Sequence, residues 1–156
     1  MNTTVKPDLP KPQGCTNLKL RQLMRRVARH YDDEVGKTGL KGTQYSLLSY
    51  VVKLGPIRAV DLAAEMKVST STLSRNLQPL VTAGLLAIGP GLDARSRLIT
   101  ATDEGQRKRV EAQRKWRVAQ EGINQILGVQ RVVALHALID EAMGLLSPAE
   151  GEEDAV

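Results

Sequence analysis

The sequence predicts a mainly α-helical protein that carries one small β-hairpin, and three observations support this. Of the 156 residues, 42% are hydrophobic but only 3% are aromatic, with no Phe, so the core must consist of aliphatic side chains. Apolar residues recur every three or four positions over most of the chain, which is the period of a helix. One short segment, residues 86–99, instead has two apolar runs separated by a polar stretch that begins with Gly-Pro-Gly, which is typical of a hairpin.

Length and charge narrow the class of protein that the sequence can encode. A chain of this length suits one compact domain or two small lobes with a shared core. The net charge is +5, although four of the last seven residues are acidic (Glu150, Glu152, Glu153 and Asp154). A basic body suits nucleic acid or an anionic membrane surface, whereas a pI near 9.6 can also serve solubility alone.

Several features favour a cytoplasmic protein with no membrane partner. No apolar run reaches the roughly 18 residues that a bilayer span needs. Residues 1–14 lack the apolar stretch of a secretory signal, and the single Cys15 excludes an intrachain disulfide. Residues 1–16 contain Pro7, Pro10 and Pro12, which favour an extended, flexible arm.

Two helices are expected next. The first spans residues 17–35 and ends at Gly36 and Gly39. Its apolar stripe consists of Leu20, Met24, Val27, Tyr31 and Val35, and its opposite face carries Arg21, Arg25, Arg26 and Arg29. The second spans residues 44–53, with Thr43 as the expected N-cap and Gly55-Pro56 as its end.

Residues 59–102 predict a module with the order helix, turn, helix and basic hairpin. A short helix at 60–66 is followed by a second at 69–83, for which Ser69 is a good N-cap. A strand at 86–88, a turn at 89–91 and a second strand then complete the hairpin. This is the order of a winged helix-turn-helix, in which each part has a separate role on a DNA duplex.

Two long helices close the chain. Thr102 is the expected N-cap of a helix that runs to Leu127, and Gly128 ends it. The last helix, residues 130–146, has a seam like that of a coiled coil, formed by Val132, Leu135, Ile139, Ala142 and Leu146. This seam could pack within the chain against the first helix, but we expect it to form a homodimer. Residues 149–156 form an acidic tail.

The helix at 69–83 has the features of a recognition helix. Leu73, Leu77 and Leu80 are expected to face inward, which leaves a polar face outward. Short hydroxyls with one Arg and one Gln match the donors and acceptors of the major groove. The expected DNA contacts on this helix are Ser69, Thr70, Ser71, Thr72, Ser74, Arg75 and Gln78. Ser69 is best explained as a cap alone, and Pro79 is unusual inside a helix.

The hairpin adds two arginines. Arg95 and Arg97 can enter a minor groove, where width and negative potential matter more than base identity. Asp93 is expected to hold an arginine in place by a bidentate ion pair. An ordinary solvated turn is the alternative, and the neighbouring recognition helix favours the DNA-binding interpretation.

These residues resemble the MarR family of bacterial winged-helix regulators. The match is to L-A-x-x-M-x-V-S-x-S-T-L-S-R from Leu62 to Arg75, then to L-x-x-x-G-L-L from Leu80 to Leu86. The wing signature D-x-R, a strand and T-x-x-G follows as Asp93, Arg95, Thr102 and Gly105. The resemblance covers about residues 17–146.

The resemblance implies a homodimer with the element order helix, helix, strand, helix, helix, strand, strand, helix, helix. It implies one domain over residues 17–148, with dimerisation helices at 17–36 and 103–147 and a winged helix-turn-helix at 41–102. It also implies a pocket for a small aromatic acid or phenol. One departure is Arg58, where the family has a Ser or Thr cap, and another is Leu20, where a peroxide-sensing branch has a reactive cysteine.

A ligand-responsive repressor that binds a pseudo-palindromic DNA operator as a dimer is therefore the function we expect. The candidate ligand-binding residues are Arg25, Arg29, His30, Tyr31, Gln44 and Tyr45, because a cation beside an aromatic ring suits an aromatic acid. Core packing of the tyrosines and a solvated arginine face explain them equally well. Two other functions stay open: a winged-helix architectural or protein-interaction module without a ligand, and a redox regulator based on Cys15.

We expect no enzyme activity, no metal site and no cofactor. The two histidines and one cysteine lack the paired spacing of a zinc site, and Gly89-Pro90-Gly91 lacks the lysine of a phosphate-binding loop.

Overall fold

The computed structural model of the protein describes residues 10–91 and 96–147, and the order of its elements is the predicted one. The elements are α1 (Thr16–Val35), the 3₁₀ turn η1 (Gly36–Thr38), α2 (Gly42–Leu54), β1 (Ile57–Arg58), α3 (Ala59–Met66), α4 (Thr70–Thr82), β2 (Leu86–Pro90), β3 (Arg97–Ala101), α5 (Asp103–Leu127) and α6 (Val129–Leu145). The fold is thus mainly helical with one small sheet, which confirms the predicted class.

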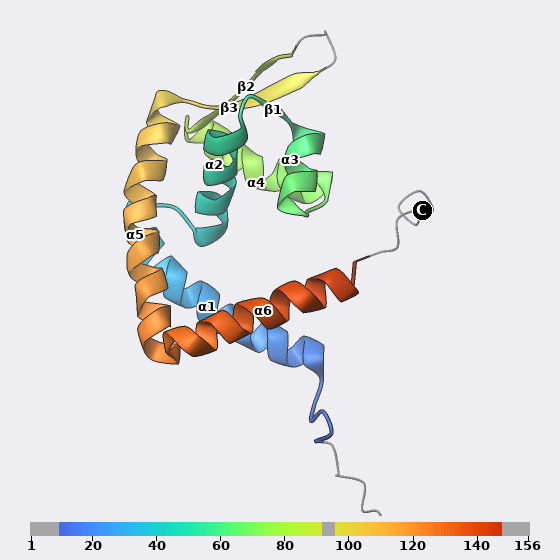
Figure 1. The fold of residues 1–156 in the computed structure, drawn as a ribbon. Helices are drawn as coiled ribbons and strands as arrows, with labels where there is room; N and C mark the ends of the chain where they lie inside the picture. The colour runs from blue at the N-terminus through green and yellow to red at the C-terminus, as the bar shows by residue number, and fades with distance from the viewer. Residues whose placement is uncertain (1–9, 92–95, 148–156) are drawn as a thin grey trace, which may run out of the picture.

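The molecule has a lobe and a frame (Figure 1). The lobe holds α2, α3, α4 and the sheet at one end of α5. The frame consists of α1, α5 and α6, with α5 running from the sheet to the opposite end of the molecule. There the chain turns by 103° between α5 and α6 at Gly128, which has a φ of 82°. Glycine adopts this backbone conformation without a steric penalty.

The core of the lobe is formed mainly by aliphatic side chains, most of them leucine, as the composition suggested. Side chains from all four walls of the lobe are under 3% exposed, including Leu48, Leu62, Leu73, Leu86 and Ile99. These residues come from α2, α3, α4, β2 and β3, so the sheet and three helices share one apolar centre. Ala112 and Ala119 of α5 are fully buried, and such small side chains let neighbouring helices approach closely.

The sheet is antiparallel, with the order β1-β3-β2. Ile88 pairs with Ile99, and Pro90 pairs with Arg97. The expected turn at residues 89–91 is therefore wrong, because Gly89 and Pro90 continue β2 and Gly91 donates its N–H to the carbonyl of Ser96 at 2.7 Å. Proline is tolerated here because β2 is an edge strand.

The start of α2 also differs from the prediction. Thr43 is not the N-cap, because the helix begins at Gly42. The N–H of Gly42 donates to Oδ1 of Asp32 in α1 at 2.7 Å, and the N–H of Lys41 donates to Oε1 of Gln44 at 2.9 Å. A carboxylate from another helix thus caps α2 in place of the predicted hydroxyl of Thr43.

The apolar stripes of the frame are largely exposed in the single chain. In α1, Leu20 and Met24 are 54% and 65% exposed. In the last helix Val132 is buried, but Ile139 is 38% exposed and Leu146, just beyond the helix, 83%. The seam therefore does not pack within the chain along its length. Among the described residues no single helix is long and apolar enough to cross a membrane.

Candidate nucleic-acid interface

Three leucines anchor the inner face of α4 and thereby turn its other face to solvent. Leu73, Leu77 and Leu80 are 1%, 5% and 1% exposed, as their spacing predicted. Oγ of Ser69 accepts the N–H of Thr72 at 3.2 Å, which confirms Ser69 as the N-cap. The cap fixes where this helix begins, and the three leucines fix which of its faces points into the core.

The outward face of α4 is polar. Ser71, Ser74, Arg75 and Gln78 are exposed, as is Thr70 in the first turn. Thr72 departs from the expected pattern, because it is half-buried and its hydroxyl accepts from Oγ of Ser69 at 2.9 Å. The exposed hydroxyl, guanidinium and amide groups offer the donors and acceptors that base edges in a major groove can pair with.

Two exposed residues that the sequence reasoning missed lie beside this face. Asn76 follows Arg75 and is exposed. Lys67 ends α3 in a left-handed conformation with a φ of 53°, which is uncommon for a residue other than glycine. It is exposed and lies two residues before the N-cap of α4, so it adds a cation to the turn. A lysine directly before Val68-Ser69 was the signal that could have found it.

The start of α3 confirms the departure noted at Arg58. Arg58 makes no side-chain cap, and its Nε and Nη2 instead donate to Oδ2 and Oδ1 of Asp61 at 2.7 and 3.1 Å. A carboxylate in the first turn is favourable beside the positive end of the helix dipole. The ion pair thus stabilises the start of this helix in place of a hydroxyl cap.

The base of the wing joins the sheet to α5. Oγ1 of Thr102 accepts the N–H of Gly105 at 3.0 Å, which confirms Thr102 as the N-cap of α5, and it donates to the carbonyl of Gly84 at 2.7 Å. Gly105 is buried against the backbone of Leu85, whose carbonyl accepts the N–H of Thr102 at 3.1 Å. In the T-x-x-G signature, the Thr therefore caps the helix and the Gly lets two backbone segments approach closely.

The described part of the wing carries one of the three predicted contacts. Arg97 begins β3 and is exposed. Asp93 and Arg95 lie outside the described residues, so the predicted ion pair between Asp93 and an arginine stays a prediction.

Comparison with known proteins agrees with this geometry. A model of the MarR family matches residues 38–96. The M. tuberculosis transcriptional regulator MosR in complex with DNA is 29% identical, with a TM-score of 0.67 over 83% of this chain and 98% of that one. A MarR mutant from E. coli complexed with operator DNA is 18% identical, with a TM-score of 0.74 over 81% and 92%. No curated protein sequence matches the chain.

Residues 38–96 are the part of the chain that matches the MarR family. A further similar structure, the S. aureus MepR–DNA complex, is 14% identical, with a TM-score of 0.74 over 86% of this chain and all of that one. The match and the 29% identity to MosR support a DNA-binding transcriptional regulator rather than an enzyme.

The predicted ligand residues of this chain do not share one pocket. Tyr31 lies at a hollow of about 330 Å³, which is lined by Ala28, Tyr31, Asp32, Lys41, Gly42, Thr43, Ser46 and Trp116. Its ring and that of the buried Tyr45 lie 6.2 and 6.4 Å from the ring of Trp116. The Tyr31 hydroxyl donates to Oε1 of Gln120, and burial raises the pKa of this hydroxyl above its usual value. Trp116 was not among the predicted residues.

The other four candidates lie elsewhere. Arg25 and Arg29, with Gln22 and Arg26, line a separate hollow over α1. His30 packs against Gly122 of α5, where an added Cβ would lie 2.7 Å from Nε2. Gln44 uses its Oε1 at the start of α2. The predicted pairing of a cation with the tyrosines is therefore not what the structure brings together.

Within the described residues no group of three or more His, Cys, Asp and Glu side chains is placed to hold a metal ion. Cys15 is free and exposed directly before α1.

Proposed function

We propose that this protein is a homodimeric MarR-family repressor that binds a pseudo-palindromic operator and is released by a small aromatic acid or phenol. In this mechanism the two recognition helices read half-sites about one helical turn, roughly 10 bp, apart. The observation that carries the proposal is the polar face of α4, which the buried leucines and the Ser69 cap hold outward.

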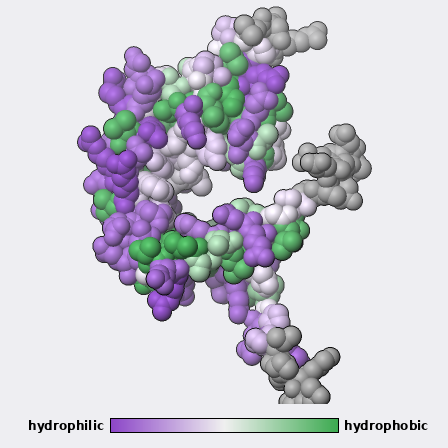
Figure 2. Space-filling model, viewed as in Figure 1, coloured by the Kyte–Doolittle hydropathy of each residue, from purple (hydrophilic) through white to green (hydrophobic). Residues whose placement is uncertain are grey.

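The exposed apolar faces of the frame support the dimer. Val133 and Leu138 of α6 are 62% and 63% exposed, and Met24 of α1 is 65% exposed. Figure 2 shows hydrophobic side chains distributed along the arm that α6 forms below the lobe. Apolar surface of this extent marks an interaction site, and a second copy offers the same surface in return.

The dimer is tested by placing a charge on this surface. Leu138→Asp should convert a dimer to a monomer in light scattering coupled to size exclusion, because an unpaired carboxylate would be buried. Val60→Asp is the matched control, since Val60 is 56% exposed but lies on α3. A wild-type protein that is already monomeric, or a Leu138→Asp variant that stays dimeric, would contradict the proposed interface.

The proposed DNA contacts are of two kinds, those that read bases and those that bind phosphate. Arg75→Ala should mainly reduce discrimination between operator and scrambled duplex, because Arg75 is on the base-reading face. Arg95→Ala should weaken binding to all duplexes and lower the salt slope by about one, as loss of one phosphate contact does. Arg114→Ala on the outer face of α5 should change neither quantity. Operator affinity that is unchanged in both test variants would contradict the assignment.

The aromatic cluster beside the 330 Å³ hollow supports an aromatic ligand. The rings of Tyr31 and Trp116 can contact a small aromatic ring on its face or edge. Benzoate and phenol should raise the melting temperature saturably and weaken operator binding, and a coupling of about 1–3 kcal/mol is typical. Tyr31→Ala should remove the response. No saturable response to either compound would contradict release by such a ligand.

A further inference from the structure

A second hollow lies between α2 and α5, on the side of the lobe where the two helices meet near the sheet. Its volume is about 450 Å³, and it is lined by Ser49, Tyr50, Val52 and Lys53 of α2 and by Arg109 of α5. It shares none of these residues with the hollow beside Tyr31 and Trp116. The two hollows are therefore separate: the aromatic hollow is lined by α1 as well as by α2 and α5, whereas this hollow is lined by α2 and α5 alone.

Two polar atoms at this hollow are buried without a hydrogen-bond partner among the described residues. They are Nε of Arg109 and Oγ of Ser49. No other side-chain atoms of the described residues are in this situation. Buried polar groups are nearly always paired, so two orphaned groups on the same hollow indicate a partner that is not part of the described chain.

The free atom of Arg109 belongs to the edge of the guanidinium that binds oxyanions. Nη1 of Arg109 donates to Oε1 of Gln113 at 3.1 Å, which holds the group on its other side. In Arg58 and Arg107 of the same chain, Nε and Nη2 together hold a carboxylate, from Asp61 and Glu104 respectively. Asp61 uses both of its oxygens, whereas both donors of Arg107 meet the single Oε2 of Glu104. An oxyanion at Arg109 would be held in one of these two ways.

The charge at the hollow favours an anion as this acceptor. Lys53 and Arg109 are both among the lining residues, and no carboxylate is. A partly buried guanidinium without a counterion is unfavourable, and an anion would also reduce the repulsion between the two cations. The volume suits a small organic acid or phosphate rather than a macromolecule.

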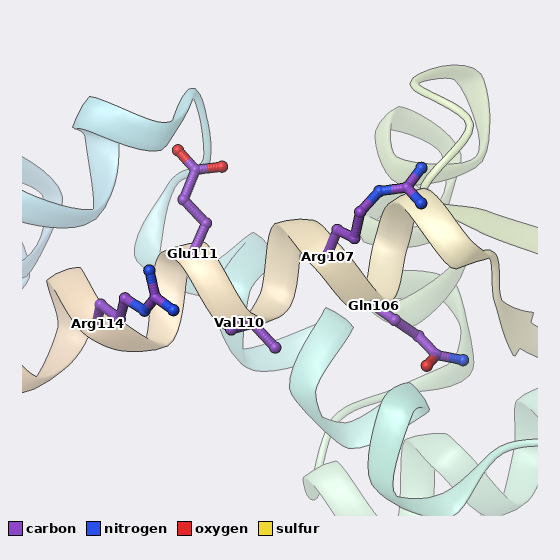
Figure 3. A pocket seen from close by; sticks show the side chains of 5 residues that line it. All are labelled: Gln106, Arg107, Val110, Glu111 and Arg114. Atoms are coloured by element: carbon purple, nitrogen blue, oxygen red, sulfur yellow. The ribbon is translucent and has the colours of Figure 1, made fainter.

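Two other hollows over the described residues lack this combination. Figure 3 shows one of about 410 Å³ whose five labelled side chains all come from α5, so it has no opposite wall. Its Arg107 is already paired with Glu104 at 2.6 Å. The hollow at Arg25, Arg26 and Arg29 is likewise lined by α1 alone.

We propose that Ser49, Lys53 and Arg109 form a binding site for a small carboxylate or phosphate anion, separate from the aromatic site. The bound anion would bridge α2, which carries Leu47, Leu48 and Val51 into the core of the lobe, to α5 of the frame. The proposal goes beyond the proposed function and does not depend on it, since neither the dimer nor the aromatic ligand enters the argument.

The test uses the full-length protein with inorganic phosphate or acetate, and with chloride at equal ionic strength as the reference. At least one anion should raise the melting temperature saturably and give a dissociation constant by calorimetry. Arg109→Gln should weaken that constant at least about tenfold, as expected for a lost charged hydrogen bond. Arg114→Gln, on the exposed outer face of the same helix, should leave it unchanged.

Stability provides a readout that does not depend on detecting the ligand. In chloride, Arg109→Met should be at least as stable as the wild type, because it removes a partly buried charge without a counterion. In saturating phosphate the order should reverse, because only the wild type gains from binding. Ser49→Ala is a milder variant that should also weaken binding if Arg109→Gln does not fold.

Three results would overturn the proposal. The first is no saturable response to either anion, and the second is equal affinity in the wild type and Arg109→Gln. The third is an effect of Arg109→Gln on the salt dependence of DNA binding without any binding of free anion, which would place a DNA phosphate there instead. Tyr31→Ala should abolish the benzoate response and keep the phosphate response, so failure of one site is distinguishable from failure of the other.

Discussion

Gly105→Ala tests the contact that joins the wing to α5. A Cβ at this position would lie 2.9 Å from the carbonyl carbon of Leu85 and closer still to its oxygen. The obstacle is backbone and not the end of a flexible side chain, so one of the two segments must move. Leu85 lies between α4 and β2, and its carbonyl accepts from the backbone N–H of Thr102 at 3.1 Å. A shift there strains the cap of α5 as well.

The expected loss follows from three contributions. Overpacking costs about 1–3 kcal/mol, and a weakened hydrogen bond from Thr102 adds about 0.5–1.5 kcal/mol. Alanine in place of glycine within a helix stabilises the folded state by about 1 kcal/mol, which offsets part of this loss. The net destabilisation is about 2 kcal/mol, which corresponds to a melting temperature lower by about 4–8 °C for a domain of this size.

Urea unfolding followed by Trp116 fluorescence measures this difference, at one fixed protein concentration because dimerisation would contribute to stability. Gly144→Ala in α6 is the matched control: no atom outside its own helix turn lies within 4 Å of the added Cβ, so stability should be unchanged or higher. A Gly105→Ala protein within about 0.5 kcal/mol of the wild type, a typical surface effect, would refute the close-approach argument.

Three further predictions concern single side chains. Pro79→Ala should stabilise the protein by about 1–3 kcal/mol in the same urea assay, because residue 79 gains the N–H that the carbonyl of Arg75 lacks; a loss of stability would contradict this. Ser69→Ala should cost about 1 kcal/mol and Ser69→Asp should restore it, whereas failure of Asp to rescue would show that Ser69 acts by something other than capping. Tyr31→Phe should remove one tyrosine whose pKa burial raises from an absorbance titration. Because the pKa of Tyr31 is raised in the folded protein, this tyrosine ionises first in the unfolded chain as the pH rises past 10.0. Stability should therefore fall above that pH, and the fall should be smaller in the variant.

The features that could be predicted from the sequence are those that local physics determines. The leucines at 73, 77 and 80 share a face because of the helical period alone. Ser69 and Thr102 cap their helices because a hydroxyl at that position reaches an N–H three residues ahead. The order of elements and the polar outer face of α4 follow from these local rules.

The features that were missed depend on residues distant in sequence. Thr43 is a good capping residue, but Asp32 of α1 reaches the helix start and Gly42 takes the first position. His30 packs against Gly122 of α5, a neighbour that the sequence could not show. No periodicity reveals such contacts, because they depend on how α1, α2 and α5 pack together.

One face of α5 connects the features on which the proposals depend. Gly105, Arg109, Ala112, Trp116 and Ala119 follow one another at spacings of four, three, four and three, so they lie on the same side of the helix. The first four meet, in order, the base of the wing, the α2 hollow, the core and the aromatic cluster, and Ala119 is fully buried.

This face has little freedom to move. Ala112 and Ala119 are fully buried, and the site of Gly105 has no room for a Cβ, so α5 cannot shift along α2 without displacing Leu85 and the start of β2. A ligand that prefers one position of α5, at Arg109 or at Trp116, would therefore also bias the wing. On this argument Gly105→Ala should alter the effect of benzoate or phosphate on operator affinity, even though Gly105 lines neither hollow. An unchanged coupling in that variant would show that the ligands act through α2 and the lobe instead.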